Sequence, residues 1–417
     1  MSSRHSPNRI RVGVVHPGTQ HSWQTASALQ ELRNLSWFAT SIFYVADRWP
    51  YNALNFLPRP YRSRVHRELM RFYHPSLDPS FVHTFGTSQW LMRMASRAGW
   101  KRTANFFMRL NDKSIAVPVD RLMRERPIDV VWAYDLSALE VFQAAKKRGI
   151  KCILDRTIGH PSVYNAVMTP VYDEFREFFT TPDFRIPDRI IERADLEHDL
   201  ADQILVGSGF CEKTLKETLT SNFHDRIHVV PYCFDKRFEG VKNRVERESV
   251  GPIRFLFLGQ AAPRKGIHLV LKAFEKVPAS AATLQIVGDL QIPRATFARY
   301  SDRVEYTATV PRAEVPELMQ QADCLLFPSY FEGAALSIAE AQAVGLKVIQ
   351  SRNTGMVADN SDPLVLADLT VDSVYRMMMK VIEAPELLSS SPTKSDAPNQ
   401  YSFSQYRDRV RRVIQNV

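Results

Sequence analysis

The 417-residue sequence predicts an α/β protein built from two doubly wound domains. Short apolar segments alternate with helical segments along most of the chain, and this alternation stops and restarts near residue 250. The apolar segments are apolar throughout, which is typical of parallel strands buried on both faces. Repeated strand–helix alternation indicates parallel sheets with right-handed crossovers. The chain is also too long for one ordinary core, since domains average roughly 100–200 residues.

In the first half, the predicted strands are rich in valine and isoleucine. They are RIRVGVVH (9–16), SIFYVA (41–46), DVVWAY (129–134), KCILDR (151–156), QILVGS (203–208) and RIHVVPY (226–232). Helical segments lie between them, such as LSALEVFQAAKKRG (136–149), in which Gly149 stands where a helix C-cap is expected.

In the second half, the same alternation returns. The predicted strands are IRFLFLGQ (253–260), TLQIVG (283–288), VEYTATV (304–310), CLLFPS (324–329) and KVIQS (347–351). The predicted helices are HLVLKAFEKV (268–277), AEVPELMQQ (313–321) and LSIAEAQAVG (336–345). A ligand of two such domains is expected in the cleft between them, at the carboxyl ends of the strands.

The expected boundaries follow from changes in composition. We expect residues 1–235 to form an N-terminal domain, 236–252 a polar linker, and 253–400 a C-terminal domain. Residues 401–417 form a terminal amphipathic helix with Tyr406, Val410 and Val413 on one face. Residues 47–126 are predicted to be a basic helical insertion within the first domain.

The net charge of +9 is concentrated in one part of the chain. Residues 41–126 carry 15 Lys and Arg against 6 Asp and Glu, interleaved with aromatic residues. This composition is compatible with a solvated helical face, with an anionic membrane surface, or with nucleic acid. No RNA-reading motif supports the last alternative, so we expect no nucleic-acid partner.

Other features of the composition exclude several classes of protein. The four cysteines are widely scattered and form no metal-binding pattern, so we expect reduced thiols and no metal. The sequence contains no run of about 18 apolar residues, so it predicts no membrane span. The N-terminus lacks the apolar region of a signal peptide, so we expect a cytoplasmic protein, with peripheral attachment to the inner membrane face as a further hypothesis.

The stretch SYFEGAALSIAEAQAVGLKVI (329–349) carries two carboxylates, Glu332 and Glu340, separated only by small or apolar residues. A strand enters a loop here, and a helix is expected to begin near Ala335. The backbone N–H groups of such a helix start attract anions such as phosphate. The flanking carboxylates instead suit hydroxyl groups, because an ionised carboxylate accepts hydrogen bonds. A sugar, a diphosphate and a ribose fit this order of groups.

A second segment, FLFLGQAAPRKGIHLVLKAF (255–274), supports this interpretation. Gly259 follows a strand, and Arg264, Lys265 and Gly266 precede a helix. Two cations at a loop–helix junction suit a diphosphate.

These motifs together resemble the nucleotide-sugar domain of retaining glycosyltransferases of the family-4 type, which have the GT-B fold. Glu332 and Glu340 match the family's E-x7-E motif, and ADQILVGSGFCEKTL (201–215) is similar to another of its segments. VVPYCFD (229–235) and YSFSQYRDRV (401–410) resemble its domain-end signature and its closing helix. The resemblance is specific over about 200–415 and diffuse before that.

The resemblance implies transfer of a sugar from a nucleoside diphosphate sugar to a glycan, lipid-linked or small-molecule acceptor, with retention of configuration and without a metal. It assigns the donor sugar to Glu332, the diphosphate to Lys265 and the ribose to Glu340. The remaining donor-binding candidates come from the same two segments and the strand between them. They are Gly259, Gln260, Arg264, Gly288, Gly333, Ala334, Ala335 and Leu336.

Two strand ends in the first half supply further candidates. The acceptor-side candidates are Gly18, Thr19 and His21, in the loop VVHPGTQHSW (14–23). His160, in ILDRTIGHPSVYN (153–165), is either a donor-sugar or acceptor contact and thus a catalytic candidate, or an ordinary loop histidine.

The sequence also departs from the family pattern. Gln260 stands where the family commonly has an arginine, so one charge partner of the diphosphate is missing unless Arg264 substitutes for it. The alternative function is therefore a catalytically weak or inactive nucleotide-sugar-binding subunit.

Overall fold

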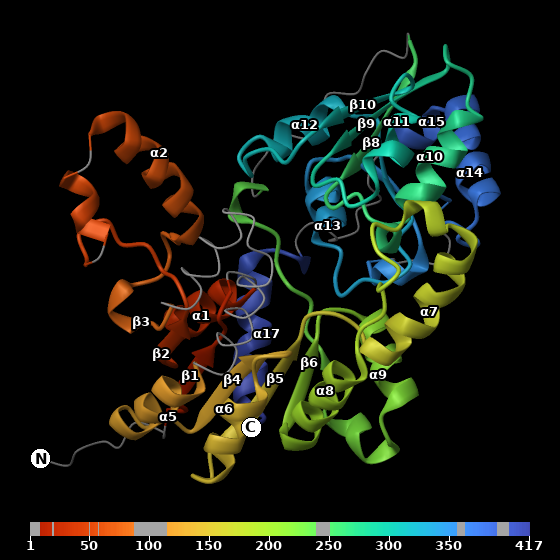
Figure 1. Ribbon diagram of the computed structural model, residues 1–417. Coiled ribbons are helices and arrows are strands. Elements are labelled where there is room, and N and C mark those ends of the chain that lie inside the picture. The colour runs from red at the N-terminus through yellow and green to blue at the C-terminus, as the bar shows by residue number, and fades with distance from the viewer. Residues whose placement is uncertain are drawn as a thin grey trace, which may run out of the picture. The chain divides into compact units, whose positions relative to one another are not determined.

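The computed structural model describes residues 9–18, 21–49, 51–56, 58–86, 115–238, 251–356, 363–389 and 400–417 (Figure 1). As predicted, the chain is an α/β protein with two sheets. It divides into two compact units. The first unit contains Met1–Arg156, Glu192–Leu205 and Arg407–Val417, and the second contains Thr157–Ile191 and Val206–Tyr406. Most of the predicted linker, 239–250, lies outside the described residues, and the predicted domain boundaries stay predictions.

The first sheet has seven strands in the order β3-β2-β1-β4-β5-β6-β7. They are β1 (Val12–Val15), β2 (Leu35–Thr40), β3 (Val82–Thr84), β4 (Val130–Tyr134), β5 (Lys151–Arg156), β6 (Gln203–Val206) and β7 (Ile227–Val229). The pairs β1–β2, β1–β4, β2–β3 and β4–β5 are parallel, as their uninterrupted apolar sequences predict.

The helices in this half of the chain are α1 (Ser22–Glu31), α2 (Arg59–Leu69), α5 (Ala116–Glu125), α6 (Leu139–Lys146), α7 (Pro161–Glu174), α8 (Asp188–Leu200) and α9 (Gly209–Thr218). The predicted helix 136–149 is confirmed as the shorter α6, and Gly149 has the positive φ of 68° that favours glycine at a helix end.

The strand predicted at 41–46 is wrong. The pairing strand β2 is Leu35–Thr40, directly before it, while Ile42, Phe43 and Tyr44 are buried outside any strand. The apolar run extends through both segments, so its pattern alone does not tell which half forms hydrogen bonds with β1. The segment 47–126 also differs from a wholly helical insertion, because β3 within it pairs with β2 as the edge strand of the sheet.

The second sheet has five strands in the order β10-β9-β8-β11-β12, with all recorded pairs parallel. They are β8 (Ile253–Leu258), β9 (Ala282–Val287), β10 (Val304–Thr307), β11 (Cys324–Phe327) and β12 (Lys347–Gln350). The helices are α10 (Ile267–Glu275), α11 (Arg294–Ala298), α12 (Val315–Gln321), α13 (Leu336–Ala343), α14 (Val371–Glu383), α15 (Glu386–Ser389) and α17 (Phe403–Gln415). Every strand predicted in this half is confirmed. Four begin at the predicted residue and end one to three residues earlier than predicted, and β9 is shifted by one residue toward the N-terminus.

Both faces of the second sheet are buried, as an uninterrupted apolar strand requires. Phe255 and Phe257 of β8 point into a core formed with α7, α10 and α14, while Leu256 and Leu258 point into a second core formed with α12 and α13. These helices surround the sheet in Figure 1. Helix α17 buries Tyr406, Val410 and Val413, as its sequence predicts.

None of the four cysteines forms a disulfide, and all four are buried. Among the described residues, no helix combines the length and the apolar content that crossing a membrane would require.

Candidate functional site

The candidate site of the second unit lies where the order of the strands reverses. β8 is flanked by β9, which follows it in the chain, and by β11, which comes after two further strands. The loops that leave β8 and β11 at their carboxyl ends are therefore neighbours, and such switch points are where α/β sheets bind ligands. The β8 loop carries Gly259 to Lys265, and the β11 loop carries Glu332.

The structure brings three predicted residues of these two loops into direct contact. The Oε1 atom of Glu332 lies 2.9 Å from Nη1 of Arg264 and 3.2 Å from Nζ of Lys265. The same oxygen accepts a hydrogen bond of 2.8 Å from the Ser329 hydroxyl. Lys265 also lies 4.6 Å above the centre of the Phe327 ring, a cation–π contact. We call Arg264, Lys265 and Glu332 the cation cluster.

The cation cluster is almost removed from water and has an excess positive charge. The side chains of Glu332, Lys265 and Arg264 are 9%, 14% and 19% exposed. Burial raises the pKa of Glu332, but the two cations outweigh it and hold that pKa below the usual value. Burial lowers the pKa of Lys265, and the negative charge of Glu332 raises it by a smaller amount. With all three groups charged, one positive charge is left over, and a phosphate would balance it.

Backbone geometry explains two glycines beside the cluster. Gly259 has φ 121° and Gly288, after β9, has φ 140°, values that L-residues other than glycine rarely adopt. A Cβ on Gly288 would lie 1.9 Å from the carbonyl oxygen of Gly259, whereas a Cβ on Gly259 would meet nothing within 4 Å. Gln260, the residue after Gly259, is exposed.

The start of α13 agrees only in part with its sequence interpretation. The helix begins at Leu336, close to the predicted position, but the N–H of Leu336 already donates to the carbonyl of Ala334. The N–H groups of Gly333, Ala334 and Ala335 donate to no acceptor in the part of the chain that the structure describes. Those three N–H groups are therefore available to donate to an anion, whereas the N–H of Leu336 already has an acceptor.

Gly333 has a packing role that the sequence did not indicate. A Cβ at this position would lie 1.7 Å from the carbonyl oxygen of Thr157, which is in the same unit. The carbonyl of Gly333 accepts a hydrogen bond from the Ser208 hydroxyl and one of 3.3 Å from the Cys211 thiol. Close packing against Thr157, rather than access for a ligand, therefore accounts for the glycine.

Glu340 lies inside α13 and is buried, with 5% of its surface exposed. Its Oε1 accepts a hydrogen bond of 3.0 Å from Nη2 of Arg312, a residue that the sequence analysis did not single out. Burial raises the pKa of Glu340, and Arg312 acts against this rise. An arginine in the connection before α12 carries no sequence signal that links it to a carboxylate 28 positions later.

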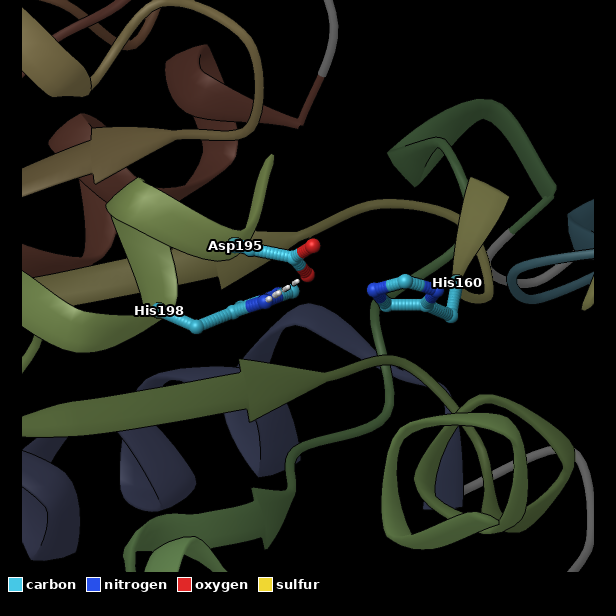
Figure 2. Close-up of side chains that lie close together, drawn as sticks. All are labelled: His160, Asp195 and His198. Atoms are coloured by element: carbon cyan, nitrogen blue, oxygen red, sulfur yellow. Dashed lines mark ion pairs between the residues drawn. The ribbon is translucent and has the colours of Figure 1, made fainter. Parts of the chain in front are cut away.

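His160 stands at the start of α7, where its ring caps the helix. Its Nδ1 accepts a hydrogen bond of 3.3 Å from the N–H of Ser162 and lies 2.7 Å from the Ser162 hydroxyl. Capping is a structural function for a residue predicted as a catalytic candidate. Figure 2 shows His160, and it also shows Asp195 and His198, which form an ion pair of 3.9 Å on α8.

The acceptor-side candidates belong to the first unit, after β1. The N–H of Gly18 donates to Nδ1 of His16 over 3.0 Å, and burial lowers the pKa of His16. His21 occupies the N-cap position of α1 without a side-chain capping bond. Thr19 lies outside the described residues.

Comparison with solved structures defines the class of the fold. Over 98% of this chain and 100% of the other, the structure is similar to Anabaena HepE in complex with UDP-glucose, with a TM-score of 0.62 and 12% identity. It is also similar to the lipopolysaccharide outer core galactosyltransferase WaaB, with a TM-score of 0.60, 13% identity and coverage of 98% and 99%. These likenesses show the GT-B fold.

Comparison of sequences adds a match in the second half of the chain. Residues 241–387 match the family described as glycosyl transferases group 1.

Two curated relatives match in part. An uncharacterised Bacillus subtilis glycosyltransferase, YqgM, is 27% identical over 200 residues, 46% of this chain and 51% of that protein. An Escherichia coli O-antigen chain mannosyltransferase B is 28% identical over 125 residues, 26% of this chain and 33% of that protein. The chain thus spans between a third and about half of the length of these relatives.

Proposed function

We propose that the protein transfers a sugar from a nucleoside diphosphate sugar to a glycan, lipid-linked or small-molecule acceptor, with retention of anomeric configuration. The observation that carries this proposal is the cation cluster at the switch point of the second sheet. Two partly buried cations share one carboxylate oxygen, at 2.9 and 3.2 Å, and leave an unbalanced positive charge. The family match of residues 241–387 covers this cluster and Glu340.

Each group in the cluster has a distinct chemical task under this proposal. Lys265 and Arg264 stabilise the negative charge that develops on the departing diphosphate, an electrostatic form of catalysis. The N–H groups of Gly333, Ala334 and Ala335 add further hydrogen-bond donors from the loop before α13. Glu332 accepts from hydroxyl groups of the donor sugar, and Glu340 accepts from those of the ribose. Because protein cations neutralise the leaving group, the reaction proceeds without a metal.

The test begins with thermal unfolding in the presence of UDP, GDP, ADP or dTDP. We expect one nucleotide to stabilise the wild type and to lose its effect in Lys265→Met, while Lys276→Met, a change at an exposed lysine of the same unit, leaves it intact. The matching nucleotide sugar should then be turned over equally well with and without EDTA. NMR of the product reports its anomeric configuration. Absence of stabilisation by all four nucleotides would overturn the proposal.

A second candidate function has a specific observation in its favour. Gln260 is exposed and follows Gly259, at which an added Cβ would meet nothing within 4 Å. Because Gln260 is uncharged, the loop has no third cation at this position. A nucleotide-sugar-binding subunit without turnover would show the nucleotide-dependent stabilisation but no transfer and no donor hydrolysis.

We also propose that the protein acts in polysaccharide or glycoconjugate biosynthesis at the cytoplasmic face of a membrane. Support comes from aromatic side chains around α2 that the fold leaves in solvent: Trp49 is 80% exposed, Phe56 91% and Tyr61 67%. Residues 48–67 contain no acidic residue, and Arg59 and Arg62 among them are exposed. Aromatic and basic side chains together suit an anionic bilayer surface.

Sedimentation with vesicles tests this location. We expect binding to vesicles that contain phosphatidylglycerol and little binding to pure phosphatidylcholine. The triple variant Trp49→Ser, Phe56→Ser and Tyr61→Ser should stay in the supernatant. Equal sedimentation of the variant and the wild type would show that this surface does not bind the membrane.

A further inference from the structure

The further inference concerns Arg312, and it rests on the proposed function because it deals with the same nucleotide site. Arg312 lies in the connection between β10 and α12, and its side chain is 59% exposed. It nevertheless bonds to a carboxylate that is only 7% exposed, Glu340, through Nη2 and Oε1 at 3.0 Å. Its Nε also lies 3.7 Å from Oδ2 of Asp235, within ion-pair distance.

The two oxygens of Glu340 are therefore unequal. Oε1 is occupied by Arg312, whereas Oε2 accepts no hydrogen bond from any described residue. Arg312 thus holds one oxygen of Glu340, and the other oxygen is left without a donor in the described part of the chain. A carboxylate oxygen in this state is an acceptor for hydroxyl groups.

The charge of Glu340 depends on its neighbours. Burial favours the neutral acid and raises the pKa, and Asp235 raises it further, while Arg312 and Arg237 lower it. Arg237 is engaged with Asp235, to which it donates through Nε at 3.0 Å and Nη2 at 2.8 Å. Arg312 is the cation that contacts Glu340 directly, so it contributes most to keeping the carboxylate ionised.

We propose that Arg312 is a positioning residue of the nucleoside site. It holds Glu340 in the orientation in which Oε2 faces the ligand, and it keeps that oxygen an acceptor for the ribose hydroxyls. A neutral Glu340 would carry a proton on one oxygen and would lose acceptor capacity towards a pair of hydroxyl groups.

This role predicts a specific pH dependence. Without Arg312, the pKa of Glu340 rises, so more of the carboxyl group is protonated at any given acidic pH. Nucleotide affinity in Arg312→Ala should therefore be weakest at low pH and should recover as the pH rises and Glu340 ionises. We expect at least a tenfold loss of affinity relative to the wild type at pH 6 and a loss of no more than about threefold at pH 8.5.

Titration calorimetry between pH 6 and 8.5 tests the inference, with the nucleoside diphosphate that stabilises the wild type. Arg312→Lys should retain most of the affinity, and Glu340→Gln should bind weakly at every pH. The 2′,3′-dideoxy analogue should bind wild type and Arg312→Ala equally, because it lacks the hydroxyl groups that Glu340 would accept from. Arg294→Ala, a change at another exposed arginine of the same unit, serves as the control.

The outcomes separate this inference from the proposed function. A wild type that binds no nucleotide overturns both. Binding by the wild type together with an Arg312→Ala variant that loses affinity by the same factor at every pH, or loses none, overturns the role of Arg312 alone. Unfolding curves of each variant at both pH values show whether a loss of affinity reflects a loss of folded protein.

Discussion

Substitution of Glu332 by glutamine should have two opposite effects, and this makes it the most informative change in the cation cluster. Glu332 is the carboxylate between Arg264 and Lys265, at 2.9 and 3.2 Å. Removing its charge leaves two partly buried cations without their carboxylate partner. Loss of one member of a buried ion pair costs about 3–5 kcal/mol, so the unliganded second unit should be destabilised by this order.

Nucleoside diphosphate binding should become stronger in the same variant. A phosphate that contacts either cation lies within about 6 Å of the Glu332 carboxylate, because both cations contact its Oε1 directly. At an effective dielectric constant of about 20, repulsion over that distance amounts to about 3 kcal/mol for each unit of charge. Relief of only half of this repulsion corresponds to about a tenfold lower Kd.

The assay compares the free diphosphate with the nucleotide sugar by titration calorimetry. Glu332→Gln should bind the diphosphate more tightly but should lose turnover of the sugar nucleotide, because the acceptor for the sugar hydroxyls is weakened. Glu383→Gln, at an exposed glutamate of the same unit, should change neither quantity. A weaker affinity of Glu332→Gln for the diphosphate, as expected for Lys265→Met, would refute the electrostatic reasoning.

Three further predictions follow from individual contacts. Gln260→Arg should lower the Kd for the nucleoside diphosphate by about tenfold, measured by calorimetry, because it adds a cation beside Gly259; unchanged affinity would show that this position does not face the phosphates. Burial lowers the pKa of His268 from 6.5 to about 3. The contribution of the neutral ring to stability is therefore fully present above pH 6.5 and is lost as the pH falls, by about 3 kcal/mol at pH 4. Urea unfolding of His268→Gln should lack that part of the pH dependence. Glu197→Ala should reduce the free energy of unfolding by about 3 kcal/mol, because the Glu197 carboxylate accepts hydrogen bonds from the N–H groups of Leu136, Ala138 and Leu139 at the start of α6. A loss under about 1 kcal/mol in urea unfolding would contradict this.

The sequence by itself determined the fold class and most strands of both sheets. Strands such as β8 and β11 are buried on both faces, so their apolar runs are long and unbroken and are read directly from composition. The sequence also predicted the local order of groups around Glu332 and Lys265, because the strand end, the glycine, the cations and the helix start lie within a few residues of one another.

Other features were decided only by the tertiary structure. Which half of the apolar run 35–46 forms β2 depends on the partner strands β1 and β3, which are distant in sequence. The need for glycine at 333 comes from the carbonyl of Thr157, and the contact of Arg312 with Glu340 joins two segments that share no pattern. Periodicity and local motifs report what a segment does within a few turns. Contacts between distant segments depend on how sheets and helices pack, and that packing set the charge and orientation of the carboxylates at this site.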